Sequence, residues 1–506
     1  MGIPVETPAD LGLAAILAVA DGAEIELSPR LMRRLAASRG DTVLALAENG
    51  PVYGVTTGLG SQAHLAVAAV DQPAFQDDLM LARSVGTGPW LGRREVRATL
   101  AARLRTLLEP EVGASGDLAT ALVAVLRADL HPAVPARGNG GAGEIIPLAH
   151  LGAFLTGRGE GVDASGDIRP ALDLLRDAGL APYSFAAKEG IAFLEGVPVA
   201  AAQAVLAGAA TRLLAAQSLA ATAAEVVVVR APRDPYIATL ARGDTELAAV
   251  HDALRALVGD EPTPWMPQAP VSFRVVGPAL AHLLRARAQL DGAVERVLTG
   301  VSTSPALVEG RFLGTAGFDG FDLAASADGL RLAVLHLGEV AAARLHRMLD
   351  PRVTGLPSQL SAEPGRHAGL VALHKRVVGL LHEARRAAAP ASLGATDTSL
   401  GQEDVQSFGL EATLAAYAAL RVLRDITACE LVVVHQATLL DRTGAHGSAR
   451  LQALLHQAFE TLPDSPEDRP TGRDVTALVQ VLDGCWAHDV LGPTGDFPSH
   501  TPPIPS

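Results

Sequence analysis

The 506-residue chain has few aromatic residues, few cysteines and a deficit of positive charge. Aromatic residues make up 4% of the sequence and hydrophobic residues 49%, so its core must be built mainly from aliphatic side chains. Two cysteines, Cys429 and Cys485, are too few for a disulfide framework or a cysteine metal site, and they fit a reducing cytosol. The formal net charge of −14 argues against nucleic acid and anionic membranes as partners.

The chain also lacks an N-terminal segment in which basic residues precede an apolar core, so we expect no secretory signal and a cytoplasmic location. Its most apolar run, residues 197–229, is rich in alanine. The run is interrupted by Gln203, Arg212, Gln217 and Glu225. Because the hydrocarbon core of a bilayer disfavours such groups, the run predicts a buried helix rather than a membrane span.

Alanine is abundant, which favours long helices that pack closely. Residues 330–345, 370–381 and 410–440 repeat aliphatic side chains at the spacing of one helix face. We expect these segments to be the rods of a central bundle in an all-α fold. Residues 9–50 indicate short helices instead, with apolar positions at Leu31, Leu35, Val43, Leu44 and Leu46.

Glycine is concentrated in residues 137–150, which read Arg-Gly-Asn-Gly-Gly-Ala-Gly-Glu-Ile-Ile-Pro-Leu-Ala-His. Because glycine adopts backbone angles that other residues avoid, the first half of this stretch predicts a tight loop. Pro147 suits the first position of a helix, and Leu148, Leu151 and Phe154 follow at helical spacing. On glycine spacing alone, a purely structural loop is the favoured interpretation.

A second glycine loop, residues 52–60, carries Tyr53 and precedes Ala142 by 89 positions. Further motifs follow in order: Lys188-Glu-Gly-Ile-Ala-Phe-Leu-Glu-Gly196, Pro267-Gln-Ala-Pro-Val-Ser-Phe-Arg274, Phe318-Asp-Gly320, Gly355-Leu-Pro357 and Leu400-Gly-Gln-Glu-Asp404. In order and spacing they resemble the motifs of the histidine and phenylalanine ammonia-lyase family, from about Leu11 to about Asp441. The resemblance implies an all-α, ammonia-lyase-like fold, in which a long central helical bundle accompanies a smaller N-terminal domain of loops and helices.

We accordingly expect three parts. Residues 1–195 form an N-terminal domain that contains the tyrosine loop (52–60) and the glycine-rich loop (137–150). Residues 196–492 form the central and C-terminal helical bundle, and residues 493–506 form a proline-rich mobile tail. The resemblance further implies a homotetramer whose active sites are shared between subunits and take a small-molecule substrate.

In the family, the loop that matches residues 137–150 carries Ala-Ser-Gly, which cyclises into a methylidene-imidazolone (MIO) group. The glycine nitrogen attacks the alanine carbonyl, and loss of the serine hydroxyl leaves an electrophilic methylidene carbon. The matching residues here are Gly141, Ala142 and Gly143. Because Ala142 has no hydroxyl to lose, we expect no MIO, and we predict no other cofactor and no metal.

An intact Ala-Ser-Gly does occur at residues 114–116. It is not followed by Pro-Leu-Ala-His, and the residues after it resemble the helix that precedes the cofactor loop in the family. We therefore expect Ser115 to cap that helix. Formation of an MIO from residues 114–116 is the alternative.

The resemblance implies roles for other matched residues. Tyr53 matches the general base, and Arg274 matches the arginine that holds the substrate carboxylate. Glu403 matches a carboxylate near the substrate amine, although a charge partner at a helix N-terminus is the structural alternative. Three further residues are expected in the substrate pocket, the last of them as a wall: Gln268, Gln402 and Phe318.

Arg83 stands at the position that selects the substrate in the family. Its guanidinium would suit a carboxylate, a phosphate or another anion. Next to Tyr53 it would also lower the pKa of the phenol, as a base near neutral pH requires. An ion pair between Arg83 and Glu195 or Glu403 is an equally weighted alternative.

Three departures from the family fall where it keeps its cofactor. Ala142 replaces a serine, Val271 replaces a tyrosine, and Glu195 replaces an asparagine. The last change adds a charge, which is costly inside a pocket unless it is paired or used. Together the three changes are consistent with abandonment of MIO.

The leading hypothesis is a lyase-type enzyme that works without MIO and catalyses elimination, isomerisation or cyclisation of a small anionic, amine-bearing metabolite. Arg274 and Arg83 would hold this substrate, and Tyr53 with Glu403 or Glu195 would form the acid/base pair. One alternative is a genuine MIO-dependent aromatic amino-acid ammonia-lyase or aminomutase, such as a histidine ammonia-lyase. The other is a catalytically inactive homologue that binds a ligand or assembles with an active paralogue.

Overall fold

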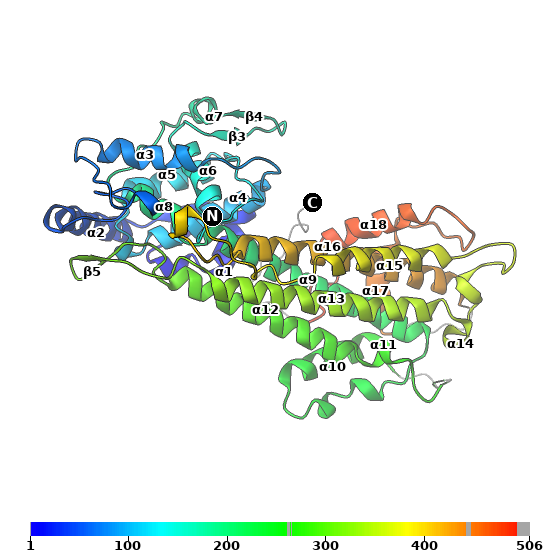
Figure 1. Cartoon of the computed structure of the whole chain (residues 1–506). Coiled ribbons are helices and arrows are strands. Elements are labelled where there is room, and N and C mark those ends of the chain that lie inside the picture. Colours follow the sequence, from blue (N-terminus) through cyan, green and yellow to red (C-terminus); the bar gives the residue numbers. More distant parts are fainter. Residues whose placement is uncertain (1, 261–263, 265, 442–446, 493–506) are drawn as a thin grey trace. The chain divides into compact units, whose positions relative to one another are not determined.

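The computed structural model describes residues 2–260, 264, 266–441 and 447–492 (Figure 1). This part of the chain is mostly helical, which confirms the all-α prediction. Its contacts define two compact units, each made of three segments. The first unit contains Met1–Leu206, Leu290–Asp328 and Pro390–Leu414, and the second contains Ala207–Gln289, Gly329–Ala389 and Ala415–Ser506. The division of the chain into 1–195 and 196–492 stays a prediction, and the tail 493–506 lies outside the described residues.

Short helices make up much of the first unit. They are α1 (Leu13–Ala20), α2 (Pro29–Glu48), α3 (Gln72–Arg83), α4 (Arg93–Leu107), α5 (Gly116–Arg127), α6 (Ile145–Leu155), α7 (Ala171–Asp177) and α8 (Glu189–Leu194). Helices α3, α6 and α8 pack against one another. Three two-stranded sheets accompany them: β1 (Ile3–Val5) parallel to β2 (Ile25–Leu27), β3 (Glu160–Val162) antiparallel to β4 (Ile168–Pro170), and β5 (Ala306–Val308) antiparallel to β6 (Arg311–Leu313).

Helix α2 corrects the prediction for residues 9–50. Its 20 residues form one continuous helix, and its buried positions are Leu31, Leu35, Thr42 and Ala45. Val43 and Leu44, two of the apolar positions named for this segment, are 51% and 63% exposed. The reason is the helical period: once Leu31 and Leu35 face inward, positions 42 and 45 share their face, whereas 43 and 44 turn outward.

Long helices form a bundle, as the apolar periodicity predicts (Figure 1). They are α9 (Pro198–Val228), α12 (Val276–Thr299), α13 (Phe321–Met348), α15 (Val371–Arg386) and α16 (Gly409–Leu440). Within the second unit, Arg344 of α13 forms ion pairs with Glu225 of α9 and Glu430 of α16. The same unit also contains α10 (Thr245–Val258), α11 (Val271–Arg274), α14 (Pro351–Thr354), α17 (Ala449–Phe459) and α18 (Gly472–Asp483).

Short 3-10 helices join several of these elements. They lie at Pro8–Asp10, Gly60–Gln62, Pro110–Val112, Asp234–Tyr236, Ala238–Ala241, Ser358–Leu360 and Ser399–Gly401. The second and the last of them, Gly60–Gln62 and Ser399–Gly401, contact each other. This contact brings the tyrosine loop close to the segment that precedes Glu403.

The apolar run around α9 is a buried helix, as predicted. The stretch Glu189–Val228 is long and apolar enough to cross a membrane by length and composition, but 94% of its most apolar window is buried inside the fold. Two of its polar side chains find partners in the second unit. Gln217 donates a hydrogen bond to the Leu482 carbonyl at 2.8 Å, and Glu225 pairs with Arg344.

Candidate active site

The glycine-rich loop leads directly into α6. This helix begins at Ile145, so the prediction that Pro147 would be its first residue is wrong by two positions. The Glu144 carbonyl accepts a hydrogen bond from the Leu148 nitrogen at 3.0 Å, so Pro147 lies inside the first turn of the helix. Pro147 is tolerated there because the first four nitrogens of a helix need no partner within it.

Glu144 ties the loop to the start of α9. Its buried carboxylate accepts hydrogen bonds from the backbone nitrogens of Val199, at 2.5 Å, and Ala200, at 2.6 Å. Burial raises the pKa of Glu144 to about 8, although these bonds oppose the shift. Glu144 was not among the residues predicted from the sequence. Its position directly after Gly143, where the family has an aspartate, was the available signal.

Glu403 contacts the centre of the loop. One oxygen of its carboxylate, Oε2, accepts the N–H of Ala142 at 2.8 Å, and the other, Oε1, accepts the Ser399 hydroxyl at 3.0 Å. Helix α16 begins only at Gly409. The carboxylate is thus bonded to the glycine-rich loop rather than placed in the first turn of that helix, which was the structural alternative.

The residues of the loop do not fit an MIO group. Ala142, at the middle position of the tripeptide, presents a methyl group where the ring chemistry requires a leaving hydroxyl.

The intact Ala-Ser-Gly at 114–116 lies at the start of α5. The Ser115 hydroxyl accepts a hydrogen bond from the Leu118 nitrogen at 3.1 Å, which confirms the expected helix cap. Its backbone nitrogen donates to Glu189 at 2.8 Å, and its hydroxyl lies 3.3 Å from that of Tyr183. Ring closure at this place would require the nitrogen of Gly116, the first residue of the helix.

We expect Ser115→Ala to lower the free energy of unfolding by about 1 kcal/mol, because one N-terminal N–H of α5 loses its partner. Chemical denaturation would measure the change. Ser28 caps α2 in the same way, with the Leu31 nitrogen 3.1 Å from its hydroxyl, so Ser28→Ala is the matched control and should show a similar loss. Loss of a near-UV absorbance band in Ser115→Ala alone would show instead that this serine forms a chromophore.

Tyr53 lies half-buried in its loop, and its hydroxyl accepts a hydrogen bond from the Gly60 nitrogen at 2.8 Å. Burial raises the pKa of Tyr53. Glu195 and Glu403 also raise it, against the Gly60 hydrogen bond and the positive charge of Arg83. The expectation that Arg83 would bring this pKa below its ordinary value is therefore wrong: burial and two carboxylates outweigh one guanidinium.

Arg83 is the last residue of α3, and its half-buried guanidinium donates to the Leu79 carbonyl at 3.4 Å. Burial lowers its pKa, while Tyr53 and Glu403 oppose the shift. Within the described part of the chain, no ion pair links it to Glu195 or Glu403, so the predicted alternative of a paired Arg83 is not observed. The guanidinium remains available for an anion.

Glu195 is the C-cap of α8 and directly precedes Gly196, whose carbonyl accepts the Glu144 nitrogen at 3.1 Å. The Glu195 carboxylate accepts hydrogen bonds from the Ser304 nitrogen and from the Thr303 hydroxyl, the latter at 3.0 Å. Burial raises the pKa of Glu195 to about 7, against the charge of Lys188 and these bonds. The carboxylate is thus anchored beside the glycine-rich loop.

The other predicted residues divide between the units. In the first unit, the Phe318 backbone lies next to the glycine-rich loop, because a Cβ atom added at Gly143 would be 3.5 Å from the Phe318 carbonyl oxygen. The Gln402 side chain is exposed. Gln268 and Arg274 belong to the second unit. Gln268 is exposed, and Arg274 is partly buried next to Phe273, as expected from its apolar neighbours. Their place in a common site stays a prediction.

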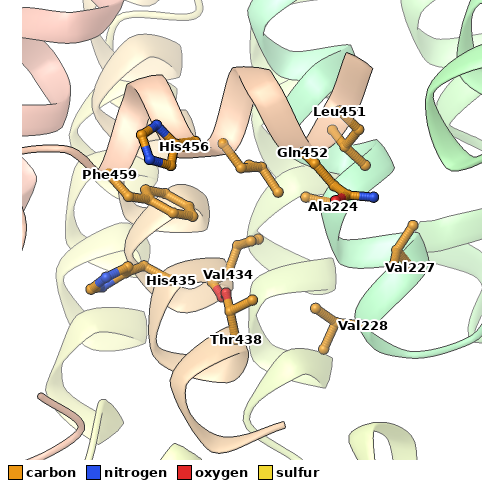
Figure 2. A pocket seen from close by; sticks show the side chains of 11 residues that line it. Ala224, Val227, Val228, Val434, His435, Thr438, Leu451, Gln452, His456 and Phe459 are labelled. Atoms are coloured by element: carbon orange, nitrogen blue, oxygen red, sulfur yellow. The ribbon is translucent and has the colours of Figure 1, made fainter. Parts of the chain in front are cut away.

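A hollow lies within the second unit, between α9, α16 and α17 (Figure 2). It encloses about 210 Å³, and its wall is mostly apolar. The rings of His435 and Phe459 meet there in an edge contact, with centroids 4.9 Å apart. Four polar side chains line it: His435, Thr438, Gln452 and His456. The candidate active-site residues do not line this hollow.

The helical bundle and the loop held by Glu403 define the class of this protein. The chain belongs to the aromatic amino acid lyase family, whose model matches residues 11–460. The histidine ammonia-lyase of Rhodospirillum rubrum is 31% identical, over 96% of this chain and 97% of the relative. The histidine ammonia-lyase of Symbiobacterium thermophilum is 30% identical, over 94% of this chain and 96% of the relative.

Solved structures show the same fold. Ergothionase of Treponema denticola, an ergothioneine-degrading enzyme, superposes with a TM-score of 0.89 at 22% identity, over 95% of this chain and 98% of its own. Tyrosine aminomutase of Streptomyces globisporus superposes with a TM-score of 0.89 at 24% identity, over 95% of this chain and 97% of its own. These structures confirm the fold, and the family model together with the histidine ammonia-lyase relatives confirms the predicted family and lyase-type homology.

Proposed function

We propose that this protein is an MIO-independent enzyme on the aromatic amino acid lyase scaffold. It catalyses elimination, isomerisation or cyclisation of a small anionic, amine-bearing metabolite. The observation that carries the proposal is the side chain of Ala142, which has a methyl group where the family has the leaving hydroxyl. Because the site has no electrophile to capture the amine, the substrate must itself carry a good leaving group.

The charges of the site support an anionic substrate. Arg83 has no ion-pair partner among the described residues. The charge of Arg83 lowers the pKa of Tyr53, and the charge of Tyr53 raises the pKa of Arg83. A guanidinium binds carboxylate or phosphate through two parallel hydrogen bonds. Arg274 is proposed to hold a second acidic group or to share the first, with Gln268, Gln402 and Phe318 completing the pocket.

Tyr53 and Glu195 are proposed as the acid/base pair. The Tyr53 phenolate takes a proton from the substrate carbon, and the protonated Glu195 gives its proton to the departing group. Glu403, whose oxygens are bonded to Ala142 and Ser399, orients the loop and the substrate amine. The proposal includes a cytoplasmic homotetramer with shared active sites, in which nucleic acid and membranes have no part.

Mass spectrometry of the intact protein tests the proposal. We expect the mass of the unmodified 52.1-kDa chain and no near-UV absorbance beyond that of its aromatic residues. Formation of MIO would remove two molecules of water and add an absorbance band. If both changes appear, the proposal is wrong, and their persistence in Ser115→Ala would exclude residues 114–116 as their source.

A genuine MIO-dependent histidine ammonia-lyase is the second candidate. The similarity to histidine ammonia-lyases over nearly the whole chain favours it. A catalytically inactive homologue that binds a ligand or assembles with a paralogue is the third. Assays for turnover of amino acids, aryl acrylates, and phosphorylated or dicarboxylic metabolites separate the candidates. Thermal stabilisation by an anion without turnover supports the third.

A further inference from the structure

Lys188 is a buried cation next to the candidate site. Its side chain is fully buried, and its backbone adopts the left-handed conformation with φ of 76°. A residue other than glycine is held in that conformation only at a cost in free energy. A buried ammonium group also requires compensation by a partner. The surroundings of Lys188 must supply that compensation.

The Thr303 hydroxyl links the Lys188 ammonium to the carboxylate of Glu195, which compensates its charge. The Lys188 ammonium donates to the Thr303 hydroxyl oxygen at 2.9 Å, and that hydroxyl donates to Oε2 of Glu195 at 3.0 Å. Both hydrogen bonds therefore point in the same direction, from the cation to the carboxylate. The other carboxylate oxygen, Oε1, has no hydrogen-bond partner within the described part of the chain and is left for a ligand.

We infer that Lys188, acting through Thr303, is a positioning residue that sets the protonation state of Glu195 and holds one of its oxygens away from the substrate. The inference rests on the proposed function, in which Glu195 exchanges a proton with the substrate.

Several charged groups face this pair from other elements. Arg103 of α4 donates to the backbone carbonyls of Glu195 and Ala192. Arg103 and Arg39 both act against the charge on Lys188. Tyr53 also interacts with the pair, since the charge of Glu195 raises the pKa of its phenol. Lys188 remains the cation with the largest effect on Glu195.

Burial lowers the pKa of Lys188 and raises that of Glu195, so it narrows the difference in proton affinity between the two ends of this chain of hydrogen bonds. A proton can therefore pass from the Lys188 ammonium to the Thr303 oxygen while the Thr303 hydroxyl proton passes to Oε2 of Glu195. The products are a neutral amine and a carboxylic acid, and no further reactant is needed.

Infrared titration of the resting protein tests the inference. The difference spectrum between the wild-type protein and Glu195→Gln isolates the carboxyl band of residue 195, and its pH midpoint reports the pKa. Thr303→Val removes the hydroxyl at nearly constant volume, and we expect it to move this midpoint upward by about one to two pH units. Thr303→Ser retains the hydroxyl and should restore the wild-type midpoint.

Two further variants make the result decisive. Lys188→Met removes the cation and should also raise the midpoint. Thr222→Val is the matched control, because the buried Thr222 hydroxyl bonds only to the Ser218 carbonyl of its own helix, and it should leave the midpoint unchanged. An unchanged midpoint in Thr303→Val or Lys188→Met, or an equal shift in Thr303→Ser, would overturn the inference. The titration needs no substrate, so its outcome is independent of the mass measurement that tests the proposed function.

Discussion

Tyr53→Phe is expected to lower kcat by about 10²–10⁴-fold, the loss usual for removal of a group that transfers a proton in the transition state. The substitution deletes only the hydroxyl that accepts the Gly60 hydrogen bond, and the ring keeps its packing. The fold should therefore survive. Steady-state kinetics with a substrate identified by the turnover assays, together with the melting temperature, would measure both quantities.

Tyr183→Phe provides the matched control. The Tyr183 hydroxyl donates to Glu189 at 2.7 Å, and its contacts are with the N-terminus of α5 rather than with the glycine-rich loop. We expect a loss of stability in this variant and an unchanged kcat. If Tyr53→Phe retained kcat within roughly twofold of the wild type, Tyr53 would have no part in proton transfer.

The pH profile of the wild type gives an independent check on the same assignment. Tyr53 must be deprotonated to act as a base, and its pKa is raised; Glu195 must be protonated to act as an acid, and its pKa is about 7. Below about pH 7 the phenolate fraction falls with pH while Glu195 is already protonated, so kcat/KM should decline. Between the two pKa values the rise in the Tyr53 phenolate fraction cancels the fall in the protonated Glu195 fraction, so kcat/KM should stay constant. Above the pKa of Tyr53 only the loss of protonated Glu195 continues, and kcat/KM should fall again.

The long helices could be predicted from the sequence because their burial follows a local rule. An apolar residue at every third or fourth position places one face of a helix in the core whatever the rest of the chain does. The same rule holds in α2, where Val43 and Leu44 are apolar but exposed. Two adjacent apolar residues cannot both share the face of Leu31 and Leu35, and the helical period was the signal that excluded them.

The site could be predicted only in part. Motif order identified Tyr53, Glu403 and the loop around Ala142, and the structure brings these residues to one place in the first unit. The protonation of Tyr53 could not be predicted, because it depends on how deeply the fold buries the phenol. Thr303 was not identified at all, since the hydrogen bond that gives it a role links it to Glu195 across more than one hundred positions.

Arg344→Met is expected to lower the free energy of unfolding by about 3–5 kcal/mol, the usual cost of removing one partner of a buried ion pair. Arg344, Glu225 and Glu430 are fully buried in the second unit, and the guanidinium bonds to both carboxylates. Burial raises the pKa of both glutamates, and Arg344 opposes the shift in each. Without Arg344, the carboxyl groups of Glu225 and Glu430 remain buried with neither water nor this cation to stabilise their charge.

The pH dependence of this loss distinguishes charge from packing. A carboxyl group whose pKa is raised by folding binds its proton more tightly in the folded state, so its contribution to stability is present at low pH and is lost as pH rises through the folded-state pKa. Arg344→Met raises both pKa values further. Its destabilisation should therefore be largest at neutral and alkaline pH and should shrink on acidification, as urea denaturation at several pH values would show.

A charge-free triad completes the test. Arg344→Met combined with Glu225→Gln and Glu430→Gln leaves no buried ion, and replacement of a whole buried cluster by neutral side chains is often close to neutral in stability. We expect the triple variant to recover most of what Arg344→Met loses. Equal instability of the single and triple variants at every pH would mean that the methylenes of Arg344, and not its charge, hold α9, α13 and α16 together in the second unit.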